Sequence, residues 1–293
     1  VDASPLRPPS DEERAMIPYF AQPHLSLGPI SIHLCGGLVA VGILTGLRLM
    51  RWRAGRLGLD VALAERLGLW VVVGGFASAH IFDRLAYFPR ETLADPLSLL
   101  RFWESISSFG GFLGAVVVAL VFLRRRPDKW AYLELLGCVL PVGWFFGRLG
   151  CFVAFDHPGT PTTFFLAQRY RDGVIRHNLG LYEALYVLPV ALLFLWLGRG
   201  GARRPAFFAG LSAVLYAPVR FLLDTLRTDD ARYFQLTPGQ YSAILLLAVG
   251  VVLLVLALLW AVALERPYWR RLVGAGSAQA VAARVWPVPF IPA

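Results

Sequence analysis

Charged residues are scarce in this sequence. Lys, Arg, Asp and Glu make up 16% of its 293 residues, whereas hydrophobic residues make up 57%. Soluble domains carry about 25% charged residues, so this composition argues against a soluble protein. Apolar runs of about 20 residues, the length that spans a bilayer, recur along the whole chain. We therefore expect one polytopic membrane domain.

Cysteine is also scarce. The three cysteines, Cys35, Cys138 and Cys151, all fall within apolar segments, and no two of them have a paired spacing. This pattern gives no sign of a disulfide framework or a zinc site, so their default role is that of small buried hydrophobic side chains. Cys151 is the exception, because it lies beside Arg148 near the end of an apolar segment.

No basic and aromatic surface module of the kind that binds nucleic acid is visible, although the net charge is +9. The arginines instead cluster in short loops between apolar runs, as the positive-inside rule predicts. The chain also does not start with a basic region followed by an apolar one. No cleavable signal peptide is therefore visible, and we expect the first spanning segment to direct insertion.

Seven segments are apolar enough to be expected as transmembrane helices, because a segment that crosses lipid must satisfy its own backbone groups. We place them near residues 29–50, 62–88, 105–123, 130–155, 180–198, 206–226 and 240–264. Arginine clusters follow the first, third, fifth and seventh segments, which puts all four basic loops on one side of the membrane. The positive-inside rule makes that side the cytoplasm, with the N-terminus outside and the C-terminus in the cytoplasm.

The expected fold is therefore all-α and polytopic, in three parts. A periplasmic segment of residues 1–25 precedes a seven-helix transmembrane domain of residues 26–265, and residues 266–293 form a cytoplasmic tail. On the outer side, residues 156–179 are rich in ionisable groups where the rule expects few cations. This loop suggests a site for a lipid headgroup, and a solvated loop with local ion pairs is the alternative.

Two arginines lie within apolar segments. Arg148 lies near the end of the fourth expected span, between Gly147 and Gly150, and Arg220 lies in the sixth. A guanidinium inside a bilayer costs at least about 2.5–3.5 kcal/mol on insertion scales, so it is rarely idle. Two cations that face a lipid-accessible cavity would suit the phosphate of a phospholipid.

Carboxylates accompany the second arginine. Asp224 follows Arg220 by four residues and precedes Arg227 by three, spacings that allow ion pairs on one helix face. Within lipid such pairing lowers the cost of each charge. The pattern fits a phosphate clamp held by carboxylates, and a purely structural ladder of ion pairs is the alternative.

Two further runs are candidates for chemistry. Gly110 and Gly111 open the third span, where small residues also permit close packing of helices. The run from Arg176 to Glu183 leads into a helix, and we expect Glu183 in its first turn, near the positive end of the helix dipole. His177 in this run could be a general base or proton shuttle, or an interfacial hydrogen-bond donor.

Taken in order, these runs resemble the prolipoprotein diacylglyceryl transferase family. That family has the fingerprints H-G-G-L-I-G, G-R-I-G-N-F-x-N-x-E-x-x-G, R-H-P-S-Q-L-Y-E, Y-G-x-F-R-F-x-x-E-x-x-R-x-P-D and a later G-Q. The counterparts here are Phe109–Gly114, Gly147–Gly159, Arg176–Glu183, Tyr216–Asp230 and Gly239–Gln240. The resemblance covers roughly residues 18–265, in the same order and with near-identical spacing.

The resemblance implies a seven-span enzyme of the bacterial inner membrane with its active site toward the periplasm. Such an enzyme moves the diacylglyceryl group of phosphatidylglycerol onto the lipobox cysteine thiol of a preprolipoprotein, and glycerol phosphate leaves. It uses no metal and no cofactor. Its partners would be phosphatidylglycerol, the preprolipoprotein and membrane lipids, and not nucleic acid.

The resemblance also carries roles onto matching positions. Arg148 and Arg220 match the two essential arginines of the family, and Arg227 keeps the family residue. The expected catalytic residues are Arg148, Arg220, Asp156 and His177. The expected substrate-binding residues are Cys151, Gly110, Gly111, Tyr182, Glu183, Asp224, Arg227 and His157.

The chain departs from the family at several of these positions. Phe109 stands where the family has a histidine linked to catalysis, and Cys35 stands where a functional tyrosine is expected. Cys151 replaces an asparagine, Asp156 and Asp224 each replace a glutamate, and His80 lies near the position of an arginine.

The loss of the family histidine leaves the base open. Phenylalanine cannot accept a proton, so activation of the thiol at position 109 is excluded, and His157, His177 or Asp156 could substitute. Three other functions are compatible with the same residues. They are a transferase with another acceptor, with Cys151 as a covalent nucleophile; a protein that binds phospholipid or lipoprotein precursor without chemistry; and a transporter, for which no inverted repeat is visible.

Overall fold

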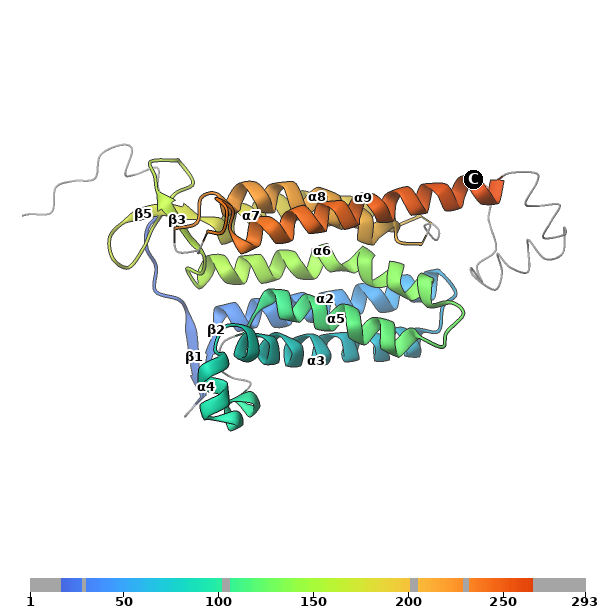
Figure 1. Ribbon diagram of the computed structural model, residues 1–293, viewed down its shortest axis with the longest axis horizontal. Coiled ribbons are helices and arrows are strands. Elements are labelled where there is room, and N and C mark those ends of the chain that lie inside the picture. Colours follow the sequence, from blue (N-terminus) through green and yellow to red (C-terminus); the bar gives the residue numbers. More distant parts are fainter. Residues whose placement is uncertain (1–16, 28–29, 102–105, 201–204, 229–231, 266–293) are drawn as a thin grey trace, which may run out of the picture. The chain divides into compact units, whose positions relative to one another are not determined.

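The computed structural model describes residues 17–27, 30–101, 106–200, 205–228 and 232–265 (Figure 1). Most of the expected N-terminal segment, the expected cytoplasmic tail and Asp230 of the family fingerprint lie outside these ranges. So does the side chain of Phe109, whose backbone belongs to a helix.

The described residues are mostly helical, as the apolar runs predict. The long helices are α2 (Leu34–Arg56), α3 (Val61–Ala86), α5 (Ser108–Leu123), α6 (Lys129–Val153), α7 (Leu179–Gly198), α8 (Phe207–Asp224) and α9 (Pro238–Glu265). Six of them are long and apolar enough to cross a membrane. The expected polytopic all-α fold is confirmed, and the orientation of the termini stays a prediction.

The third expected span is the short one. Helix α5 has 16 residues, which rise about 24 Å at 1.5 Å per residue, less than the roughly 30 Å of a hydrocarbon core. Its N-terminal boundary is set by Ser107, whose side chain accepts a hydrogen bond from the N–H of Gly110. The segment is therefore an apolar helix of less than spanning length rather than the full span expected at 105–123.

Contacts divide the described chain into two compact units. Unit 1 comprises the described residues within Val1–Gly42, Leu140–Trp196 and Ala209–Leu254. Unit 2 comprises the described residues within Ile43–Val139, Leu197–Phe208 and Val255–Ala293.

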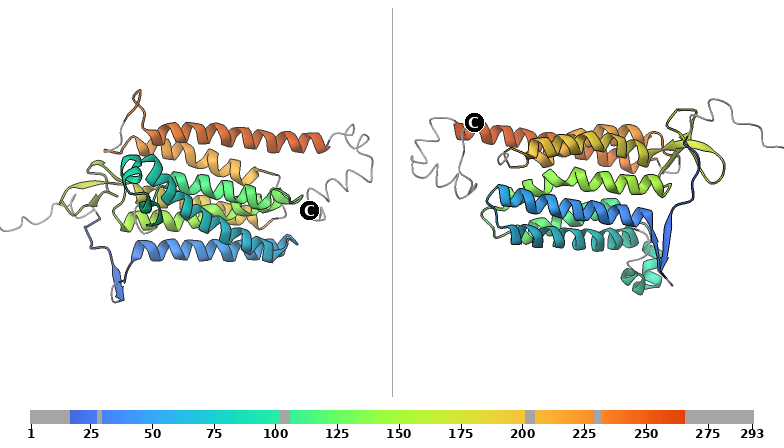
Figure 2. Two further views of the ribbon diagram at one scale, coloured as in Figure 1. Left: turned by 60° about the horizontal axis from the view of Figure 1, so that its bottom comes forward. Right: turned by 180° about the vertical axis from the view of Figure 1, so that it is seen from behind.

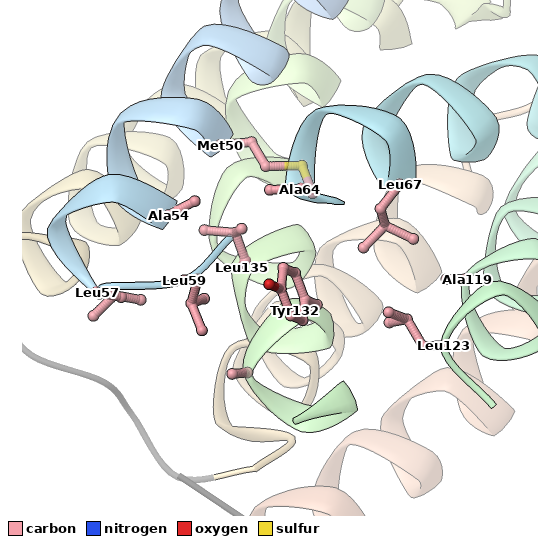
Figure 3. Close-up of a cluster of buried hydrophobic side chains, with 11 residues drawn as sticks. Met50, Ala54, Leu57, Leu59, Ala64, Leu67, Ala119, Leu123, Tyr132 and Leu135 are labelled. Carbon is pink, nitrogen blue, oxygen red and sulfur yellow. The ribbon is translucent and has the colours of Figure 1, made fainter. Parts of the chain in front are cut away.

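The core of unit 2 lies around Tyr132 of α6. Figure 3 shows Tyr132 among aliphatic side chains from α2, α3, α5 and α6, including Met50, Leu67 and Leu135, all of them buried. The hydroxyl of Tyr132 accepts a hydrogen bond from the N–H of Asp60 at 3.1 Å. Because Asp60 also caps the start of α3, this bond fixes the turn between α2 and α3 on α6.

Two buried charged residues of unit 2 form hydrogen bonds with backbone groups at helix ends. Arg53 donates a hydrogen bond to the carbonyl of Gly198, the last residue of α7. Glu134 accepts one from the N–H of Phe208 at 3.0 Å, at the start of α8. Helix ends leave backbone groups without partners, and a cation at a C-terminus or a carboxylate at an N-terminus also matches the dipole. These two charges are therefore structural.

Unit 1 carries two small antiparallel sheets that the sequence did not predict. Strands β1 (His24–Leu27) and β2 (Ile30–His33) form a hairpin. Strands β3 (Pro158–Pro161), β4 (Gln168–Arg169) and β5 (Ile175–Asn178) form a sheet in the order β3-β5-β4. Both views in Figure 2 show this second sheet, in yellow-green, at the N-terminal end of α7. Strand β5 runs directly into α7 and so fixes where that helix begins.

Close packing of α3 and α5, which lie side by side in Figure 1, depends on glycine. A Cβ added at Gly114 would lie 2.1 Å from the side chain of Ser78 and 3.1 Å from the carbonyl oxygen of Gly74. At Gly46 of α2 an added Cβ would meet nothing within 4 Å.

Gly114→Ala is therefore expected to lower the thermal unfolding temperature of the detergent-solubilised protein. Overpacking typically costs about 1–3 kcal/mol, more than the roughly 1 kcal/mol that alanine adds to helix propensity. Gly46→Ala is the matched control, which should unfold at the parent temperature or slightly above it. Equal unfolding temperatures for both variants would contradict this packing.

Candidate active site

A fully buried carboxylate lies at the centre of unit 1. Oε1 of Glu183, on α7, accepts a hydrogen bond from Nη1 of Arg220 on α8 at 2.9 Å. Oε2 accepts one from the hydroxyl of Tyr216 at 2.5 Å and lies 2.9 Å from Nε of Arg148 on α6. The last contact is an ion pair without hydrogen-bond alignment. Glu183 thus brings the two expected arginines together from separate helices.

The expectation about the helix dipole at Glu183 is wrong. Helix α7 begins at Leu179, so Glu183 lies beyond its first turn, which holds no acidic residue. Asn178 takes the capping position instead, where its side-chain oxygen accepts a hydrogen bond from the N–H of Leu181 at 3.0 Å. The charge of Glu183 is therefore held by the guanidinium groups rather than by the end of the helix.

A second buried carboxylate extends the network along α8. Oδ1 of Asp224 lies 2.9 Å from Nη2 of Arg220 and 3.7 Å from Nη1 of Arg227. Its Oδ2 accepts a hydrogen bond from the hydroxyl of Thr237, the residue before α9. The predicted i, i+4 and i, i+3 pairs of this helix are thereby confirmed. A Cβ added at Gly239 would lie 2.7–2.9 Å from the carboxylate atoms of Asp224, so only glycine fits there.

Hydrogen bonds at the start of α9 fix the position of Thr237, whose hydroxyl contacts the Asp224 carboxylate. The N–H of Thr237 donates to Oε1 of Gln240 at 3.0 Å, and the N–H of Gln240 donates to the Thr237 hydroxyl at 3.1 Å. This reciprocal pair is a capping box, which satisfies two backbone donors of the first turn. The positive end of the α9 dipole then stabilises Asp224 as an anion.

The network joins three arginines, Arg148, Arg220 and Arg227, to two carboxylates, Glu183 and Asp224. Buried charges interact strongly because the surrounding dielectric constant is low. Three guanidinium groups that carboxylates hold close together in such surroundings are suited to bind an anion.

The three arginines of the network differ in how much of each side chain is exposed to solvent. The side chain of Arg148 is 6% exposed, that of Arg220 is 16% exposed and that of Arg227 is 22% exposed. Arg148 is held on several sides: its guanidinium lies 4.3 Å above the ring of Trp144, and its Nη2 donates to the hydroxyl of Tyr216 at 3.3 Å. The accessible part of the cationic group therefore belongs to Arg220 and Arg227.

Cys151 lies in contact with this cluster. Its Sγ is 3.8 Å from Nη1 of Arg148, within the range of a weak hydrogen bond to sulfur. Its backbone packs against Gly180 of α7, where an added Cβ would come within 2.9 Å of the Cys151 carbonyl carbon. The sequence expectation that Cys151 differs from the other cysteines is consistent with this contact.

The chain after α6 returns to the cluster through a strained turn. Phe155 and His157 have φ of 57° and 63°, in the left-handed region that favours glycine. Gly159 then pairs with Arg227, and the N–H of Thr160 donates to the carbonyl of Leu226 at 2.8 Å. These bonds hold the turn against the residues that follow α8.

His157 in this turn is partly buried beside the arginines. Burial and the positive charges of Arg148, Arg227 and Arg220 together lower the pKa of His157 to about 4, against the opposing effect of Asp156. Asp156 is exposed, and the described residues give its carboxylate no ion pair. Asp156 therefore acts on the cluster through its field and not through a contact.

The other expected residues form two pairs, His177 with Tyr182 and Gly110 with Gly111, each with contacts of its own. Nδ1 of His177 is 2.9 Å from the hydroxyl of Tyr182, and burial lowers the pKa of His177. Gly110 and Gly111 belong to unit 2, where an added Cβ would lie 2.3 Å from Phe82 and 3.4 Å from Ala79 respectively. Their position accounts for close packing of α5 on α3.

Two residues of the network were missed from the sequence. Tyr216 lies four residues before Arg220, so helical spacing alone places both on one face of α8 and could have identified it. Thr237 was missed because its contact with Asp224 depends on how α9 folds back on α8. His80, a departure from the family, is buried in unit 2 with its Nε2 3.2 Å from the carbonyl oxygen of Ser98.

Replacing Glu183 by glutamine should destabilise the protein strongly, because Arg148 and Arg220 then lose the carboxylate that balances them. Breaking a buried ion pair from one side costs about 3–5 kcal/mol. Thermal unfolding in detergent measures the change. Asp172→Asn is the control, since Asp172 pairs with Arg176 at the surface and should unfold at the parent temperature. A Glu183→Gln variant as stable as the parent would contradict the network.

The chain is similar over most of its length to a family of known proteins. Residues 22–256 match the family described as prolipoprotein diacylglyceryl transferase. Three bacterial relatives carry the name phosphatidylglycerol–prolipoprotein diacylglyceryl transferase. The protein from Solidesulfovibrio magneticus is 33% identical over 254 residues, which are 81% of this chain and 94% of that protein. The protein from Tolumonas auensis is 29% identical over 80% of this chain and 94% of its own length. The protein from Synechococcus elongatus is 30% identical over 83% of this chain and 88% of its own length. This chain belongs to the prolipoprotein diacylglyceryl transferase family.

Proposed function

We propose that this protein transfers the diacylglyceryl group of phosphatidylglycerol to the cysteine thiol of a prolipoprotein. The thiol sulfur forms a bond to the glycerol carbon that carries the phosphate ester. The bond between that carbon and the ester oxygen breaks, and glycerol phosphate leaves with the electron pair. The thiol proton passes to a base. The names of the relatives give the donor and the acceptor.

One observation carries this proposal: Glu183 holds Arg148 and Arg220 together from two different helices. Both arginines occupy the positions of the family fingerprints. As the ester bond breaks, the leaving phosphate gains negative charge, and fixed cations near that oxygen stabilise it in the transition state. Guanidinium groups that are already oriented by carboxylates need no reorganisation when the charge develops.

Because the arginines differ in solvent exposure, we assign them different roles in binding the phosphate. Arg220 and Arg227 present their accessible edges to the phosphate, with Asp224 between them as a spacer. Arg148 stays behind Glu183, stacked on Trp144, and contributes its charge to the field. Gly110, Gly111, Tyr182 and His177 are proposed to contact the substrates outside this network.

Cys151 is not proposed to carry the diacylglyceryl group. Transfer to its thiol would give a thioether, and a thiolate is too poor a leaving group on such a carbon for a second displacement to release it. The product would be a permanently modified enzyme. The 3.8 Å contact with Arg148 instead supports a role for Cys151 as a neighbour of the proposed phosphate site.

The protein is a membrane protein, and we propose that it lies in the bacterial inner membrane with the Glu183 network toward the periplasm. The loop residues 124–126 carry three arginines and lie between two of the apolar helices, as expected for a cytoplasmic loop. With this orientation the N-terminus lies outside and the C-terminus in the cytoplasm. A phospholipid donor would keep its acyl chains in the bilayer while its headgroup reaches the arginines.

The experiment combines rescue in cells with a direct assay. Arg148→Ala and Arg220→Ala are each expected to lower thioether formation on a lipobox peptide by at least about 10²-fold, because each removes charge that stabilises the leaving phosphate. Mass spectrometry of the peptide after incubation with phosphatidylglycerol measures the product. A strain depleted of its own transferase should grow with the parent chain and not with either variant.

The matched control is Arg126→Ala. Arg126 pairs with Asp128 in an exposed loop of unit 2, so its removal should leave the rate at the parent level. If the parent chain inserts into the membrane but neither rescues growth nor modifies the peptide, the proposed activity is wrong. An adduct on a different acceptor would then indicate a transferase with another substrate, and lipid binding without turnover would indicate a binding protein.

A further inference from the structure

We propose that His157 is the catalytic base that takes the proton from the acceptor thiol. This inference rests on the proposed function and adds to it the residue that activates the nucleophile. The family position for a histidine is occupied by Phe109, which cannot accept a proton. His157 stands at a position where the family fingerprint G-R-I-G-N-F-x-N-x-E-x-x-G specifies no residue type.

The backbone positions His157 beside the cationic network. It follows α6, which carries Arg148, by four residues, and it precedes Gly159, which pairs with Arg227. Pro158, the next residue, pairs with Asn178 at the start of α7. The turn is therefore anchored to all three elements that supply the network. A φ of 63°, unfavourable for histidine, is maintained by these anchors.

The ring of His157 is available for proton transfer. Within the described residues its nitrogens make no hydrogen bond to another protein group, although the ring is partly buried. The charged groups that act on it are Arg148 from α6, Arg220 from α8, Arg227 after α8 and Asp156 in its own turn. An imidazole in this position is neutral near pH 7 and can accept a proton without first losing one.

The other two candidates fit less well. The Nδ1 atom of His177 is engaged with the hydroxyl of Tyr182, and no cation contributes to its pKa shift. Asp156 is exposed, and within the described residues no ion pair holds its carboxylate against the arginines. Only His157 combines an unoccupied ring with a place among the arginines.

The cations also link the base to the donor. In the free protein burial and the positive charges of the arginines together make His157 a very weak base, with a pKa of about 4. When a phosphate binds the cluster, its negative charge offsets the arginines, so the pKa of His157 rises toward its ordinary value. The base therefore becomes effective only once the donor is in place.

The thiol proton moves to the unprotonated ring nitrogen of His157 as sulfur bonds to the diacylglyceryl carbon. The ester oxygen leaves on glycerol phosphate with the bonding pair. His157 then returns its proton to water or to the departing phosphate, and the neutral ring is restored.

The test uses His157→Gly in the full-length protein in lipid nanodiscs. Glycine suits the left-handed backbone at this position, so the variant is expected to fold. Loss of a general base typically lowers the rate by about 10²–10⁴-fold, and we expect that loss in thioether formation. Added imidazole should restore part of the rate of His157→Gly. A residue with a purely structural role would not respond to imidazole.

The control is His24→Gln, which removes an exposed imidazole from β1 of the same unit and should leave both rate and pH profile unchanged. His157→Gln provides a second variant that keeps a side chain of similar size. Should His157→Gly retain more than a third of the parent rate, or gain nothing from imidazole, His157 is not the base. If the parent chain itself forms no thioether, the proposed function fails first.

A second readout does not depend on turnover. NMR titration of the parent protein, whose sequence holds five histidines, should show one resonance with a pKa near 4 that His157→Gln removes. Glycerol 1-phosphate should raise that pKa. The same effect should appear in the pH dependence of the rate. Protonation of His157 removes the base, so both kcat and kcat/KM should fall at low pH. Because bound phosphate raises the pKa of His157, kcat, which reports the enzyme with substrate bound, should begin to fall at a higher pH than kcat/KM, which reports the free enzyme. A pKa that stays fixed on phosphate binding would overturn the link between donor and base.

Discussion

The structure depends on one buried carboxylate that balances two guanidinium groups. Arg148 by itself is a poor residue for an apolar helix, since an unpaired cation there costs several kcal/mol. Glu183 of α7 removes that cost only if α6 and α8 present their arginines at the same level of α7. The pairing therefore fixes the axial register of three helices and positions two cations at once.

A second carboxylate balances arginines at the end of α8. Asp224 balances Arg220 and Arg227, and it needs the hydroxyl of Thr237 and the absence of a side chain at Gly239. The start of α9 is thus specified by the charge network and not only by its apolar length. Asp224 is one methylene shorter than the glutamate of the family. Because Gly239 has no side chain, the backbone at the start of α9 can approach the shorter carboxylate closely.

The helices could be predicted from the sequence because apolar length is a local property, and so could the two ion pairs that Asp224 makes with Arg220 and Arg227. The meeting of Arg148 and Glu183 could not, since it joins positions 35 residues apart whose spacing has no helical meaning. The sheet of residues 158–178 was missed for a related reason: its strands have two to four residues, too few to show an alternating pattern. The start of α7 was misjudged because Asn178 acts as a cap.

The cationic network and the neutral histidine act together. A chain without a histidine at position 109 needs another proton acceptor, and the charge of the arginines that are proposed to bind the donor phosphate also acts on His157. Burial and the field of Arg148, Arg220 and Arg227 keep His157 a weak base until a bound anion offsets the arginines. Thiolate formation then follows donor binding, and the protein avoids holding a reactive thiolate against its cations when no diacylglyceryl group is present to receive it.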